Sequence, residues 1–138
     1  MRIVLDTNVI IAGLKSKRGA SFKVLSLIGI GKFDLVLSVP LLFEYEAVLK
    51  RLKPPQLSDS DIDDILDYFC SVATQCKIFY LWRPILKDPT DDMVLELAVE
   101  SGSDFIVTFN LSDFVGSNRF GIGAITPMTF LAKIGELA

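Results

Sequence analysis

The sequence contains no histidine and only two cysteines, and these absences exclude several kinds of site. Without histidine the chain lacks the most common general base and the usual nitrogen ligand of zinc or copper. Cys70 and Cys76 do not form a Cys-x-x-Cys pair, so we expect reduced thiols rather than a disulfide. Any catalysis must therefore use carboxylates, Lys, Tyr, Ser, Thr, Cys or a metal ion with oxygen ligands.

Long apolar runs are also absent. The longest, at residues 24–30 and 35–43, are much shorter than the ~20 residues that a membrane-spanning helix requires. Met1 and Arg2 lead directly into a strand-like run without the features of a signal peptide, so we expect a cytoplasmic protein with no membrane partner. A length of 138 residues, 51% of them hydrophobic, predicts one domain over residues 1–138.

Positive charge is not in excess, because the formal net charge is -3. This balance does not mark a nucleic-acid-binding protein, since phosphate contacts come from Lys and Arg. A local basic rim beside an acidic, metal-rich pocket would still suit a polyanion, although ordinary solvated surface explains the same residues equally well. The candidate clusters are Lys15, Lys17 and Arg18, then Lys50, Arg51 and Lys53, and finally Arg83 with Lys87.

Short apolar runs alternate with amphipathic segments along the chain. Strands are predicted at residues 2–5, 34–38, 77–81, 105–108 and, from a weaker pattern, 122–126. Helices are predicted over residues 9–14 and 20–30, after Pro40, after Ser58, between Thr90 and Gly102, and from Pro127. This alternation predicts an α/β fold with an open parallel sheet that is covered by helices on both faces.

Acidic residues fall where an open parallel sheet binds its ligands, beyond the carboxyl ends of the strands. Asp6 directly follows the first strand, and Asp113 follows the strand at 105–108. Glu44 and Asp92 lie in the first two turns of helices whose N-termini face the same edge. Such a group of like charges is costly without a counterion, and Mg²⁺ or Mn²⁺ prefers these oxygen ligands. The sequence therefore predicts a divalent-metal site, where water can be activated without histidine.

Each acid also has an ordinary structural explanation. Asp6 could merely end a strand, with the Thr7 hydroxyl and the Asn8 amide capping a helix that starts at Val9, and Asp113 could be a turn residue. Asp92 and the acids just before it suit a helix N-terminus, where negative charge interacts favourably with the helix dipole. Glu44 could be solvated, and Glu46 is equally available by spacing.

Four segments together resemble the PIN-domain family in their order and spacing. They are residues 3–10 (IVLDTNVI), 38–45 (SVPLLFEY), 88–98 (DPTDDMVLELA) and 106–114 (IVTFNLSDF). The resemblance extends from Arg2 to about Phe130 and is closest to the branch described as toxin components of toxin–antitoxin systems. It implies a three-layer α/β/α sandwich with a mainly parallel sheet of four to five strands.

The same resemblance implies cleavage of phosphodiester bonds in RNA, with Mg²⁺ or Mn²⁺ as cofactor. The catalytic acids of the family fall on Asp6, Glu44, Asp92 and Asp113, and Asp6, Asp92 and Asp113 are expected to hold the metal. The supporting polar positions fall on Asn8, Thr108 and Asn110. Asp91 competes with Asp92, but the spacing to Thr108 favours Asp92.

The partners implied by the resemblance are RNA, an antitoxin protein and further copies of the chain in a homodimer or higher oligomer. Lys15, Lys17 and Arg18 would then form an RNA-facing rim. A rival interpretation is a catalytically silent PIN fold that binds RNA or protein. A haloacid-dehalogenase-like phosphatase is disfavoured by Asn8, where a second Asp is needed, and a receiver domain by Thr108, where Lys is needed.

Overall fold

The computed structural model describes residues 1–77, 86 and 88–137. Strands and helices alternate through most of this part of the chain, as predicted. In chain order the elements are β1 (Arg2–Leu5), α1 (Thr7–Lys15), α2 (Ala20–Ser26), β2 (Asp34–Leu37), α3 (Val39–Leu52), α4 (Asp59–Val72), β3 (Thr74–Gln75), α5 (Pro89–Glu100), β4 (Phe105–Val107), the 3-10 segment η1 (Leu111–Phe120), β5 (Gly123–Ile125) and α6 (Pro127–Lys133).

The strands form one five-stranded sheet in the order β3-β2-β1-β4-β5. All neighbouring strands are parallel, with Leu5 of β1 opposite Val107 of β4. Strand order reverses at β1, because β2 and β3 extend the sheet on one side while β4 and β5 extend it on the other. The prediction of an open parallel sheet is confirmed, and its switch point lies between β1 and β4.

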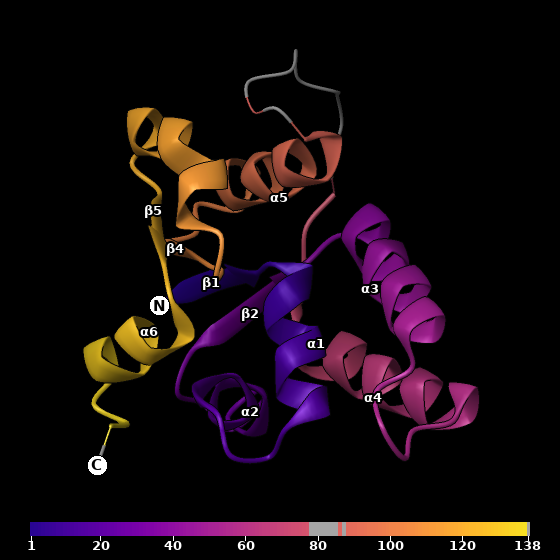
Figure 1. The fold of residues 1–138 in the computed structure, drawn as a ribbon. Helices are drawn as coiled ribbons and strands as arrows, with labels where there is room; N and C mark the ends of the chain where they lie inside the picture. Colours follow the sequence, from indigo (N-terminus) through magenta and orange to yellow (C-terminus); the bar gives the residue numbers. More distant parts are fainter. Residues whose placement is uncertain (78–85, 87, 138) are drawn as a thin grey trace.

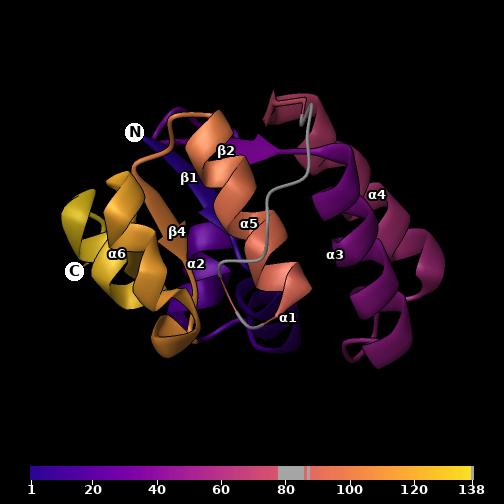
Figure 2. The ribbon, with the colours of Figure 1, turned by 90° about the horizontal axis from the view of Figure 1, so that it is seen from above.

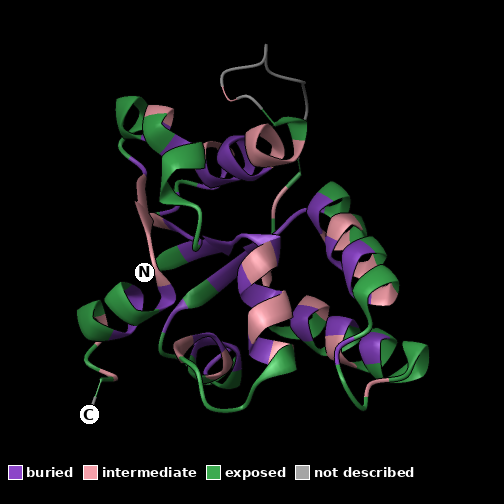
Figure 3. Ribbon diagram, viewed as in Figure 1, coloured by how far each residue is buried: buried purple, intermediate pink, exposed green. Residues whose placement is uncertain are grey.

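Helices cover both faces of this sheet. Figure 1 shows α5 and η1 above the strands and α1 with α2 below them, while α3 and α4 lie on the side of the sheet that is formed by β2 and β3. Seen from above, α5 crosses the sheet between the α3–α4 pair and the η1–α6 side (Figure 2). Buried residues gather on the strands and on the helix faces turned towards them (Figure 3). The strand residues Ile3, Val4 and Leu5 are fully buried, as expected for a central parallel strand.

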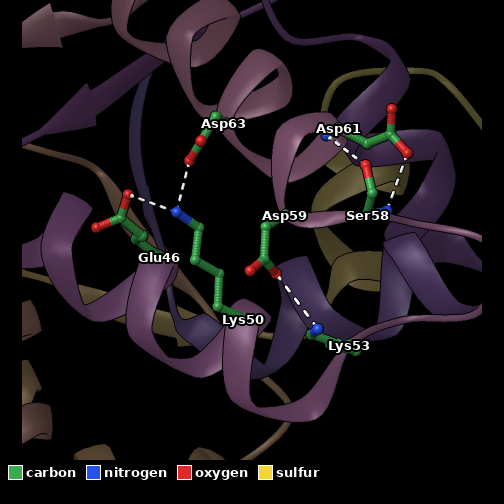
Figure 4. Close-up of polar contacts among 7 residues, drawn as sticks. All are labelled: Glu46, Lys50, Lys53, Ser58, Asp59, Asp61 and Asp63. Carbon is green, nitrogen blue, oxygen red and sulfur yellow. Dashed lines mark hydrogen bonds and ion pairs between the residues drawn. The ribbon is translucent and has the colours of Figure 1, made fainter.

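Helix α4 begins at a capping box, as the sequence indicates. The Ser58 side chain accepts a hydrogen bond from the backbone of Asp61, and the Asp61 carboxylate accepts one from the backbone of Ser58 (Figure 4). These two bonds satisfy amides that a helix N-terminus leaves without partners. Asp therefore serves here in the position where Glu or Gln is more common.

Three segments differ from the sequence-based expectation. α2 ends at Ser26 rather than near residue 30, because the amides of Leu27 and Ile28 bond to carbonyls three residues earlier and Gly29 then adopts a positive φ angle. η1 is a 3-10 segment with no clear apolar period, and it was not predicted. The strand predicted at 77–81 lies outside the described residues except for Lys77, and the observed β3 is the shorter pair at Thr74–Gln75.

In the part of the chain that the structure describes, no helix is both long enough and apolar enough to cross a bilayer.

Candidate functional site

Asp6 and Thr108 meet at the switch point of the sheet. Asp6 follows the last residue of β1 and Thr108 follows the last residue of β4, so the parallel pairing of the two strands brings them together. The Thr108 hydroxyl donates to Asp6 Oδ2 at 2.7 Å, and the backbone amide of Thr7 donates to Asp6 Oδ1 at 2.8 Å. Both side chains are buried, with Thr108 at 0% exposure. The Asp6 carboxylate is therefore held by two donors in a fixed orientation.

The remaining polar positions of this edge surround Thr108. Its hydroxyl oxygen accepts hydrogen bonds from the Asn110 backbone amide at 3.0 Å and from Asn8 Nδ2 at 3.5 Å. Asn8 Oδ1 in turn accepts from the Phe109 backbone amide at 3.5 Å. The carbonyl of Asn110 accepts from the amide of Asp113 at 3.0 Å, which starts η1 beside this network. Asn8, Thr108 and Asn110 thus tie the ends of β1 and β4 to the segment that carries Asp113.

A cleft of about 410 Å³ lies between the N-terminal end of α5 and η1. Acidic side chains from both elements face into it, whereas its other residues are small or apolar. The described residues that line it are Leu86, Asp88, Asp91, Ser112, Asp113, Val115 and Gly116. None of these carries a positive charge.

The electrostatics of Asp91 connect this cleft to the sheet edge. Burial raises the pKa of Asp91 to about 7, and the negative charges of Asp6, Asp88, Asp113 and Asp92 add to this rise in decreasing order. Like charges have such an effect only when they lie close together. Asp91 therefore belongs to an acidic cluster that includes the strand-end Asp6 and the cleft residues Asp88 and Asp113.

The pKa of Asp6 is also raised, first by burial. The hydrogen bonds from Thr108 and Thr7 oppose this rise, and the charges of Asp113 and Asp88 add to it. Asp6 thus lies within electrostatic reach of acids from η1 and from the start of α5. Of the four predicted acids, Asp6 and Asp113 interact with each other in this way, whereas the place of Glu44 in the site stays a prediction.

Asp92 has a different environment from Asp91. Its Oδ1 accepts a hydrogen bond from the backbone amide of Leu86 at 2.8 Å. Neighbouring residues of a helix point roughly 100° apart, so the two carboxylates leave α5 in different directions. Asp91 lines the cleft, whereas the sequence spacing favours Asp92. Both residues occupy the first turn of α5, and spacing from a distant strand does not distinguish positions that differ by one.

The choice between Glu44 and Glu46 is informed by the packing of α3 on α4. Glu46 Oε2 pairs with Lys50 Nζ at 3.3 Å, and the same ammonium pairs with Asp63 of α4 at 2.7 Å (Figure 4). Glu46 therefore faces α4 and already has a cationic partner. Glu44 is half-buried and lies elsewhere on the helix circumference, although the described residues that line the acidic cleft do not include it.

Tyr45 links the helix that carries Glu44 to the strand that carries Asp6. Its side chain is 0% exposed, and its hydroxyl donates to the carbonyl oxygen of Leu5. Burial raises the pKa of Tyr45 well above its ordinary value, and the nearby charge of Asp6 adds to the rise. The hydroxyl therefore stays protonated and acts as a donor.

Three of the described basic residues pair with acids or lie at the end of α1 opposite to Asp6. Lys15 ends α1 and Lys17 and Arg18 follow it, so they lie ~13 Å along the helix axis from the end that carries Asp6. Lys50 and Lys53 pair with acids of α4 (Figure 4). Arg83 and Lys87 lie outside the described residues.

The acidic cluster was tested for its fit to a divalent cation. Within residues 1–77, 86 and 88–137, no three His, Cys, Asp or Glu side chains are placed to hold one ion directly. Mg²⁺ does not require such a cage, because it usually keeps several waters and binds through one or two carboxylates. Asp6, Asp91 and Asp113 offer hard oxygen donors. Burial is the main cause of the raised pKa values of Asp6 and Asp91, and a cation would offset the repulsion that adds to it. The residues present therefore fit a partly hydrated Mg²⁺ or Mn²⁺ ion.

Comparison with known proteins identifies the family. A family model described as PIN domain matches residues 2–112, and the chain belongs to this family. PIN domains are generally nucleases and typically use divalent metal ions. No curated protein matches the sequence.

A solved structure supports the same fold. The crystal structure of VapBC2 from Rickettsia felis, bound to a DNA fragment from their promoter, is similar with a TM-score of 0.63. The match covers 90% of this chain and 98% of that chain, at 14% sequence identity. At this level of identity the likeness concerns the fold alone.

Proposed function

We propose that the protein is a metal-dependent endoribonuclease that hydrolyses phosphodiester bonds in RNA at the cleft between α5 and η1. The observation that carries the proposal is the acidic cluster formed by Asp6, Asp91 and Asp113 at the switch point of the sheet. Membership of the PIN-domain family supports nuclease chemistry at this cluster. The likeness of the sequence to the toxin branch of the family supports a role as the toxin of a toxin–antitoxin pair. An antitoxin and a second copy of the chain would then be its partners.

An Mg²⁺ or Mn²⁺ ion would bind through one or two of the carboxylates of Asp6, Asp91 and Asp113 and keep several waters, and Glu44 would contribute the fourth acid of the site from α3. When bound, the ion supplies positive charge that polarises the phosphate and lowers the pKa of the attacking water. The chain supplies orientation: Thr108 and the Thr7 amide fix the Asp6 carboxylate before any ligand enters.

The negative charge of the cleft affects how RNA and metal would bind. The described lining residues include three acids and no Lys or Arg. The negative charges of Asp88, Asp91 and Asp113 would repel a phosphodiester, and a divalent cation bound beside them would reduce this repulsion. We expect RNA affinity at this cleft to depend on divalent metal as well as on RNA sequence.

The first test measures metal binding without relying on activity. Saturating Mn²⁺ should raise the melting temperature of the wild type, because a ligand that binds the folded state stabilises it by about 2.7 kcal/mol at 100 times its Kd. For a domain of this size that is a rise of about 5–10 °C. Asp6→Asn should show a much smaller rise than the wild type. Asp34→Asn is the matched control, because Asp34 is exposed at the opposite end of the sheet. Equal rises in all three proteins would refute a shared metal site at Asp6.

The second test measures the reaction itself. Purified protein should cut single-stranded RNA in Mn²⁺, with ends that can be mapped by sequencing, and should lose this activity in EDTA and in Asp6→Asn. Cleavage that persists in both controls would indicate a contaminating nuclease. Metal binding and RNA binding without cleavage would instead support the catalytically silent alternative and overturn the proposed reaction.

A further inference from the structure

We propose that Tyr45 is a positioning residue that sets the place of Glu44 relative to Asp6, an inference that rests on the proposed function. Tyr45 directly follows Glu44 in α3, and its hydroxyl donates to the carbonyl of Leu5, which directly precedes Asp6. One hydrogen bond between residues 40 positions apart therefore joins the neighbours of two candidate metal-site acids. The bond connects β1 to α3, which come before and after β2 in the sequence.

The rest of the α3 core face does not provide this directionality. Leu41 and Leu49 lie one turn before and one turn after Tyr45 and are fully buried. Their burial favours contact with the core, but apolar contact is non-directional and tolerates small shifts along the helix axis. A hydrogen bond from a buried hydroxyl to one carbonyl is sensitive to both distance and angle. Tyr45 therefore selects one register of α3 against the end of β1.

The position of α3 makes such a restraint necessary. The helix lies on the side of the sheet formed by β2 and β3 and packs mainly on α4 and α1, whereas the other acids come from the end of β1, α5 and η1 (Figure 1). Ion pairs from Lys50 to Asp63 and from Lys53 to Asp59 attach α3 to α4, not to β1 (Figure 4). The Tyr45 hydroxyl thus makes a direct polar contact between this helix and the strand that leads to Asp6.

The chain offers a matched control for removing this hydroxyl. The hydroxyl of Tyr68 on α4 also donates to a backbone carbonyl 40 residues away, that of Ile28, at 2.9 Å. It lies beside a groove formed with α2, remote from the acidic cleft. Tyr45→Phe and Tyr68→Phe therefore remove the same chemical group and keep both rings. Only the first should affect the metal site.

The experiment compares the Kd for Mn²⁺, measured by calorimetry with the full chain, in both variants. Tyr45→Phe should bind Mn²⁺ about tenfold more weakly than the wild type, the size of effect typical of residues that orient metal ligands. Tyr68→Phe should stay within about twofold of the wild type. Both variants are expected to melt at lower temperature in EDTA, so melting alone does not separate the two roles. Equal Mn²⁺ affinities in the two variants would overturn the positioning role.

Glu44→Gln tests whether Tyr45 acts through Glu44. The double variant Glu44→Gln, Tyr45→Phe should bind Mn²⁺ no more weakly than Glu44→Gln alone, because a residue that acts through Glu44 has no further effect once its carboxylate is removed. Additive losses would refute this route. If Glu44→Gln leaves the Kd unchanged while Asp6→Asn weakens binding, the positioning role fails and the proposed metal site stands. No Mn²⁺ binding by the wild type would overturn both.

Discussion

Replacement of Asp91 by Asn is expected to reduce Mn²⁺-dependent RNA cleavage by about 100-fold or more, a loss typical of removing one group that stabilises developing charge. Asp92→Asn is expected to retain most of the activity. The reason is geometric: Asp91 lines the acidic cleft and interacts electrostatically with Asp6 and Asp113, whereas Asp92 accepts a hydrogen bond from the Leu86 amide. Initial rates for the two variants on one RNA substrate decide between adjacent carboxylates.

The same Asp91→Asn change should stabilise the metal-free protein at pH 8. Its pKa is about 7 in the folded state and near 3.8 in the unfolded state, so stability is lost as the pH rises between these values. The neutral amide removes this cost. Because the side chain is only half-buried, solvent screening reduces the gain to about 1 kcal/mol, or about 2–4 °C in melting temperature in EDTA. A site whose acids repel one another when no metal is bound predicts that Asp91→Asn raises the stability and lowers the activity.

The opposite pattern would reverse the assignment. If Asp92→Asn loses cleavage and Asp91→Asn keeps it, the spacing to Thr108 identifies the metal-site acid correctly and the cleft geometry does not. Asp88→Asn serves as an additional control, since Asn also caps helices well and the hydrogen bond to the Thr90 amide is retained. This variant should alter the local charge without unfolding the start of α5.

The end of β1 could be predicted from the sequence because its signals are local. A buried run of β-branched residues and Leu predicts that the strand ends before Asp6. The predicted helix start was wrong by two residues, because Asp6 rather than Asn8 is the N-cap and α1 begins at Thr7. Parallel pairing then requires the residue after β4 to lie beside Asp6. The rule for open sheets places both at the switch point, and the Thr108–Asp6 hydrogen bond shows the two side chains in contact.

Other features depend on side-chain direction and could not be predicted in this way. Asp91 and Asp92 differ by one position in the same helical turn, so a spacing rule treats them almost alike. Glu46 is distinguished from Glu44 only by its contact with Lys50 on the α4 side. The basic run that starts at Lys15 is prominent in the sequence, yet the direction of α1 carries it away from Asp6. A cluster of basic residues in a sequence therefore does not show whether it lies at the end of the helix that is near the acidic residues.

Replacement of Thr108 by Val is expected to destabilise the protein by about 2–3 kcal/mol, because its buried hydroxyl donates to a carboxylate. Val keeps the shape of Thr but leaves Asp6 Oδ2 and the Asn110 amide without this partner. The melting temperature should fall by about 5–10 °C at pH 7.5 in EDTA. Thr108→Ser keeps the hydroxyl, and its melting temperature should fall much less.

The pH dependence of the Thr108→Val effect identifies its cause. The Thr108 hydrogen bond lowers the pKa of Asp6, although burial keeps that pKa above 3.8. The bond therefore stabilises the ionised carboxylate, and its contribution is present above the pKa of Asp6 and declines as the pH falls through it. Chemical denaturation of the wild type and Thr108→Val should show a stability difference at pH 7.5 that shrinks towards pH 3.5. A difference independent of pH would mean that Thr108 contributes through packing, because the packing of a methyl group does not respond to the ionisation of Asp6.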